Sequence, residues 1–150
     1  MIELLRALIL LLTQDALSAD DVVARIGSVA SDPGVPMPIK IHPRQGLRSA
    51  SLARYADTAT PYLLCLEPEV AWRPTVAELT RAFGDSRRAR NDRGRPVELL
   101  FYPPSPAPKW SVVLIAELVT DGHEPEEATV ANLTLRRDPP QAVETGRGTT

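Results

Sequence analysis

The sequence contains one short helix pattern twice, and the two copies begin 57 residues apart. The first copy runs from Ser18 to Gly27 and the second from Thr75 to Gly84. In each copy an acidic residue follows the hydroxyl residue by three positions, which predicts a capping box at the helix start. The closing glycine can adopt the left-handed conformation that commonly ends a helix. Because short amphipathic helices often share such ends, the repeat needs support from the segments that follow.

Short apolar strands follow both predicted helices. Prolines bracket the first strand of each half, at residues 38–43 and 96–103, and a second apolar strand comes after it, at residues 62–66 and 110–120. A last strand at residues 131–135 alternates apolar with polar side chains. This order predicts an α+β fold, with an antiparallel sheet and short helices arranged as a tandem of two helix-then-strands units.

The same pattern sets the expected domain boundaries. Residues 1–137 are predicted to form a single domain, with the two units at residues 17–69 and 74–137. Strand 110–120 is apolar on both sides, so we expect both of its faces to be covered. Residues 138–150 are rich in Pro, Gly and Thr and are predicted to form a disordered tail.

The composition is typical of one globular domain. A chain of 150 residues with 43% apolar and 24% charged residues is able to bury a hydrophobic core. Its formal net charge of −2 gives no overall attraction to nucleic acid or anionic lipid. Of the 17 basic residues 15 are Arg, a bias that we attribute to a GC-rich bacterial genome.

Residues 1–12 predict an apolar N-terminal helix that is too short to span a membrane. Because this stretch contains Glu3 and a single basic residue, Arg6, it is atypical of a signal peptide. We expect the helix to pack into the core of a cytoplasmic protein. An exported protein, with residues 1–18 as its signal peptide, is the alternative. The single Cys65 lies in an apolar strand and favours a reducing compartment.

No motif predicts catalysis, a metal site or a cofactor. The two histidines, His42 and His123, are far apart in the sequence, and the acidic turn at residues 124–127 is typical of a solvated loop. Cys65 has no neighbouring helix start or basic residue that would favour the reactive thiolate. Neither a nucleophile elbow nor a Gly-rich phosphate loop occurs. We therefore expect a protein that is not an enzyme.

One dense charged segment lies between the second predicted helix and the strand after it. Its arginines are Arg87, Arg88, Arg90, Arg93 and Arg95. Guanidinium groups bind carboxylates and phosphates, but no aromatic residue is interleaved for base stacking. We therefore favour a protein partner with an acidic surface over nucleic acid, and a solvated connector without a binding role is the alternative. Tyr102 and Trp110, residue types common at interfaces, complete the candidate binding residues.

The two capped helices and their strands resemble the helix-plus-β-meander module of the β-lactamase inhibitor proteins and of the small outer-membrane assembly lipoproteins. Ser18, Asp21, Val22 and Gly27, and then Thr75, Glu78, Leu79 and Gly84, are the matching residues. The resemblance implies a binder that presents a sheet surface and loops to another protein. The single Cys65 differs from the disulfide-bonded inhibitors and from the acylated lipoproteins, so β-lactamase inhibition does not follow.

Together these observations predict a non-catalytic bacterial interaction protein, of the immunity, inhibitor or adaptor type. An exported envelope protein and a nucleic-acid binder that uses residues 87–95 are the alternatives.

Overall fold

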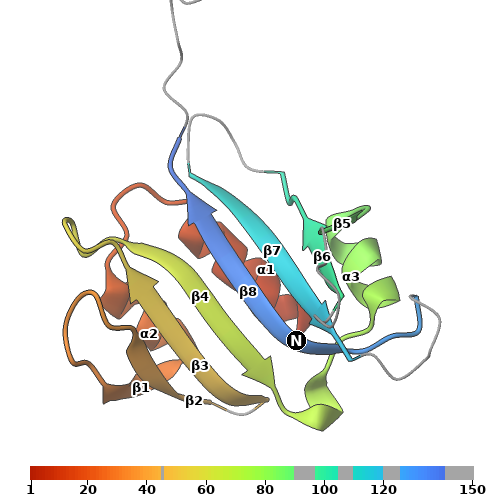
Figure 1. Cartoon of the computed structure of the whole chain (residues 1–150), viewed down its shortest axis with the longest axis horizontal. Coiled ribbons are helices and arrows are strands. Elements are labelled where there is room, and N and C mark those ends of the chain that lie inside the picture. Colours follow the sequence, from red (N-terminus) through yellow and green to blue (C-terminus); the bar gives the residue numbers. More distant parts are fainter. Residues whose placement is uncertain (45, 90–96, 105–109, 120–125, 141–150) are drawn as a thin grey trace, which may run out of the picture.

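A computed structural model describes residues 1–44, 46–89, 97–104, 110–119 and 126–140. These residues form one antiparallel sheet of eight strands, with three α-helices packed on one of its faces (Figure 1). The predicted α+β class, with an antiparallel sheet and short helices, is confirmed. In the described part of the chain, no helix has the length and hydrophobicity needed to cross a lipid bilayer.

The elements fall into two halves of the chain. The first half contains α1 (Ile2–Leu12), α2 (Ala19–Ile26), β1 (Gly27–Ser31), β2 (Ile39–Pro43), β3 (Leu47–Arg54) and β4 (Pro61–Pro68). The second half contains the 3₁₀ turn η1 (Val70–Trp72), α3 (Val76–Phe83), β5 (Arg87–Arg88), β6 (Glu98–Phe101), β7 (Ser111–Leu118) and β8 (Val130–Asp138).

The strand order in the sheet is β1-β2-β3-β4-β8-β7-β6-β5. Each half is therefore a capped helix followed by four strands, and the last strands of the halves, β4 and β8, pair at the centre of the sheet. The sequence did not indicate β1, β3 or the two-residue β5. These strands were missed because β1 and β3 are rich in Ser and Ala and lack the alternation of large apolar residues.

Both predicted capping boxes form. The Ser18 hydroxyl accepts a hydrogen bond from the backbone N–H of Asp21 at 3.1 Å, and the Asp21 carboxylate accepts one from the N–H of Ser18 at 3.2 Å. Thr75 and Glu78 repeat the arrangement at 3.1 and 3.2 Å. Gly27 is required for another reason, because a Cβ there would lie 1.9 Å from the His42 carbonyl oxygen of the adjacent strand.

Helix α1 lies between the other two helices, behind the centre of the sheet (Figure 1). It buries Leu5, Leu8, Ile9 and Leu12 in the core. Its C-terminal end is held by Arg137 of β8, whose Nε donates to the carbonyl of Leu12 at 2.7 Å. A cation near the last carbonyls of a helix also interacts favourably with the helix dipole.

Arg137 is 1% exposed and has further partners. Its guanidinium donates to the carbonyls of Gln14 and Pro61, and it lies over the Trp110 ring at 3.7 Å from the ring centroid. Burial lowers the pKa of Arg137 from its ordinary value. The buried cation thus joins β8, the end of α1 and the start of β4, which are far apart in the sequence.

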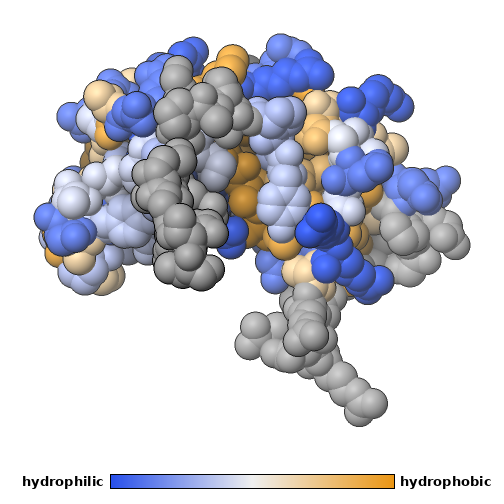
Figure 2. Space-filling model, turned by 90° about the horizontal axis from the view of Figure 1, so that it is seen from above, coloured by the Kyte–Doolittle hydropathy of each residue, from blue (hydrophilic) through white to orange (hydrophobic). Residues whose placement is uncertain are grey.

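Of the two faces of β7 that we expect to be covered, the described helices cover one. The described helices pack on one face, where Val112, Leu114 and Ala116 are buried. Val113 and Ile115 lie on the other face, which no described helix covers. Val113 is nevertheless only 4% exposed, so this face of β7 is partly buried without a described helix on it. Viewed from above, the surface is largely hydrophilic, with apolar side chains gathered near its middle (Figure 2).

Candidate functional site

The face of the sheet opposite the helices is the candidate interaction surface, and we call it the open face. Its side chains are ordered by the strand register, which aligns residues across neighbouring strands in rows. One row, the neutral row, crosses most of the sheet and consists of Ser51, Cys65, Thr134, Ile115 and Leu100. Basic residues continue it at both ends, since Lys40 pairs with Ser51 and Arg87 pairs with Leu100.

A second row on the same face is acidic. Glu117 of β7 pairs with Asn132 of β8 on one side and with Glu98 of β6 on the other. The register of β4 with β8 continues this line to Glu67, whose partner on β3 is Ser49. We call Glu67, Asn132, Glu117 and Glu98 the acidic row.

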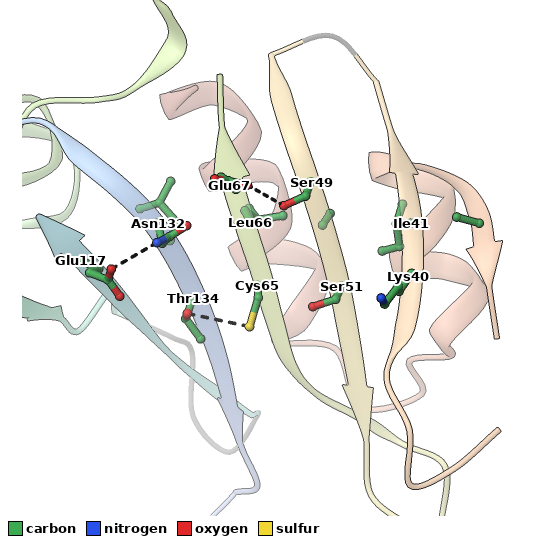
Figure 3. Close-up of a pocket in the computed structure, with 13 residues that line it drawn as sticks. Lys40, Ile41, Ser49, Ser51, Cys65, Leu66, Glu67, Glu117, Asn132 and Thr134 are labelled. Atoms are coloured by element: carbon green, nitrogen blue, oxygen red, sulfur yellow. Dashed lines mark hydrogen bonds between the residues drawn. The ribbon is translucent and has the colours of Figure 1, made fainter. Parts of the chain in front are cut away.

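Side-chain hydrogen bonds orient two of the three carboxylates (Figure 3). The Ser49 hydroxyl donates to Glu67 Oε1 at 3.0 Å, and Asn132 Nδ2 donates to Glu117 Oε1 at 3.2 Å. Among the described residues, no Lys, Arg or His forms an ion pair with a glutamate of the acidic row. The row is therefore a line of negative charge in which the carboxylates of Glu67 and Glu117 are oriented by hydrogen bonds.

Parts of the two rows line a broad hollow of about 670 Å³, with Ser51, Cys65 and Thr134 from the neutral row and Glu67, Asn132 and Glu117 from the acidic row. Its floor is formed by short side chains, because Ser51, Cys65 and Thr134 occupy positions where longer side chains would fill the space. Lys40, Glu67 and Glu117 contribute charged groups to its lining. Such a shape accommodates a protruding loop of another molecule.

The hydroxyl, thiol and amine side chains that line the hollow are those of Ser49, Ser51, Thr134, Cys65 and Lys40. The Thr134 hydroxyl lies 4.0 Å from the Cys65 sulfur, and His42, the one histidine in the described ranges, is not among the residues that line the hollow. Ser51 pairs with Lys40 across two strands, but no hydrogen bond joins their side chains, and Lys40 is exposed. Within the described ranges, no three His, Cys, Asp or Glu side chains lie close enough to hold a metal ion.

The residues predicted to bind a partner do not form one site. Arg87 and Tyr102 lie together at one edge, with the guanidinium 5.8 Å from the ring centroid, and both are exposed. Arg88 pairs with the buried Leu99 and so alternates to the helix side of the sheet. Trp110 lies against Arg137, also on the helix side. Arg90, Arg93 and Arg95 are outside the described residues, as are His123 and residues 141–150 of the predicted tail.

Sequence patterns did not reveal the open face itself. On β3, β4 and β8 its side chains are mostly small or polar residues that alternate with buried apolar residues, which is typical of any strand with one solvated face. The sequence did not predict Glu98 and Glu117 as site residues because their pairing depends on the register of two strands. Val70 and Trp72 of η1 are also exposed apolar side chains, and the charged residues Glu69 and Arg73 flank them in the sequence.

Comparison with protein-family models, with curated proteins and with solved structures gives no match to this chain. The resemblance to the β-lactamase inhibitor and assembly-lipoprotein module therefore stays a prediction. The site has to be interpreted from its own geometry.

Proposed function

We propose that this chain is a non-catalytic interaction protein that binds another protein on the open face of its sheet. The observation that supports this most is the face that no described helix covers, with its hollow and its ordered charges. Eight strands spaced about 4.8 Å apart make a face roughly 34 Å wide. Its longer strands extend roughly 26 Å, so the area is comparable to the about 800 Å² that each partner buries in a typical complex.

The proposal covers a bacterial protein of the immunity, inhibitor or adaptor type that acts in the cytoplasm. Packing of α1 into the core is consistent with this location, and an exported protein is the alternative. Nucleic acid is disfavoured on the open face because the acidic row would repel phosphates. Arg87, with Tyr102 beside it, adds a basic contact at one edge of the same face for an acidic part of the partner.

The test is capture of the partner from native lysate with variants that alter one face at a time. Thr134→Arg places a long cation on the floor of the hollow, and Ala16→Arg makes the same kind of change at an exposed position between α1 and α2. We expect the wild type and Ala16→Arg to retain one partner in near-equal amount and Thr134→Arg to lose it. Circular dichroism should show that all three are folded.

Equal recovery with Thr134→Arg would place the contact elsewhere and reject the open face. An Arg87/Arg88/Arg90→Ser variant tests the arginine segment separately from the acidic row. Loss of the partner in this variant alone would move the interface to the arginine segment. Recovery of no protein by any variant, or of nuclease-sensitive nucleic acid alone, would contradict the proposed function.

A further inference from the structure

We infer that the segment docked on the open face is basic, and that an Arg or Lys side chain of the partner lies on the acidic row. This inference rests on the proposed function and specifies the chemistry of the partner. It is carried by the charge pattern of the face and by an unfavourable pairing within the sheet.

The unfavourable pairing is that of Glu98 with Glu117, which lie directly opposite each other on β6 and β7. Like charges at opposed positions of an antiparallel pair destabilise the sheet, and Gln at either position would avoid the repulsion. Departures from such local rules concentrate at functional sites. A cation supplied by a partner would convert this repulsion into attraction.

The carboxylates are also placed to receive a donor. Glu67 and Glu117 each use Oε1 to accept a hydrogen bond from a described side chain, and Oε2 accepts none from the described residues. Asn132 of β8 lies between the strands of Glu67 and Glu117 and donates to Glu117. Guanidinium and ammonium groups form their strongest hydrogen bonds with carboxylates held in this way.

The adjoining neutral row accommodates the rest of a basic side chain. Arg and Lys lay their aliphatic stems along apolar or small side chains while the charged head remains at the polar rim. Ser51, Cys65 and Thr134 leave that space open beside Glu67 and Glu117. Charge and shape thus favour the same occupant, a protruding loop with Arg or Lys at its tip.

The experiment uses a displayed library of short cyclic peptides with random sequence, selected on the wild-type protein. Peptides that occupy the open face are those that no longer bind Thr134→Arg. We expect these peptides to be enriched in Arg and Lys and to bind less tightly as salt is added. Their affinity should fall about tenfold in Glu117→Gln and in Glu98→Gln, and stay unchanged in Glu3→Gln, an exposed control on helix α1 on the other side of the sheet.

Two results would overturn the inference in different ways. Face-binding peptides that are neutral or acidic, or that bind both row variants as tightly as the wild type, would reject the basic partner and leave the proposed function standing. Selection of peptides that all bind Thr134→Arg unchanged would count against the open face as a binding surface, and so against both proposals.

Discussion

The two faces of the sheet differ sharply along a single strand. In β8, Leu133, Leu135 and Arg137 are buried on the helix side, whereas Thr134 and Arg136 alternate with them on the open face. The helix side holds one continuous apolar cluster to which all three helices contribute. The open face carries mainly short, polar and charged side chains, with Val113, Ile115 and Leu100 among its apolar members. Stability should therefore depend on one face and binding on the other, and substitutions at adjacent residues can test this separation.

The largest expected effect compares Leu133 with Thr134. Leu133 is fully buried at the centre of the sheet, between Leu66 and Ala116, so Leu133→Ala should lower the free energy of unfolding by about 3 kcal/mol. Thr134→Ala on the open face should change it by less than about 0.5 kcal/mol. Urea unfolding followed by circular dichroism measures both. Similar losses for the two variants would show that the open face also stabilises the fold.

The next comparison is between Arg137 and Arg136. Arg137 is a charged residue buried on the otherwise apolar helix side, whereas Arg136 is exposed on the open face. Arg137→Met keeps the aliphatic stem but loses the hydrogen bonds to the carbonyls at the end of α1, so we expect a loss of about 2 to 3 kcal/mol. Arg136→Met removes an exposed ion pair with Asp138, which contributes little. Changed fluorescence of folded Arg137→Met would report the altered contact with Trp110.

An Arg137→Met variant as stable as the wild type would mean that the apolar cluster alone holds α1 on the sheet. Arg136→Met serves as the control for loss of an arginine from the same strand. If both variants lost stability equally, net charge rather than the α1 anchor would explain the effect.

The sequence predicted the covered face better than the open one. Ser18 and Thr75 located α2 and α3 through local capping chemistry, and large alternating residues located β2, β4, β6, β7 and β8. Arg137 is indistinguishable in the sequence from the exposed Arg136, since its partners on α1 are more than a hundred residues away. The opposition of Glu98 and Glu117 likewise depends on register. The sequence could not predict these two features because both depend on contacts between residues that are far apart in the chain.

A smaller effect of opposite sign is expected on the open face. Glu98→Gln removes the repulsion from Glu117, so the free energy of unfolding should rise by about 0.5 kcal/mol. The gain should shrink in high salt, which screens exposed charges. Urea unfolding at low and high ionic strength measures it. A loss of stability at low salt would indicate that Glu98 is already neutralised within the chain and would remove the unfavourable pairing as support for a basic partner.

The smallest effect concerns an ion pair at the edge of the sheet. Asp32, which follows β1, lies 2.7 Å from Arg54 at the end of β3. The hydrogen bond from Arg54 holds the pKa of Asp32 below its usual value, and the N–H of Gly34 acts in the same direction. Because the folded state lowers this pKa, the ion pair stabilises the fold above the unfolded pKa of about 3.9, and the contribution is lost as the pH falls through the lower folded value. Asp32→Asn should therefore unfold at a lower urea concentration than the wild type near neutral pH, and the two midpoints should converge in acid. A constant difference across this pH range would assign the effect to the side-chain amide rather than to charge.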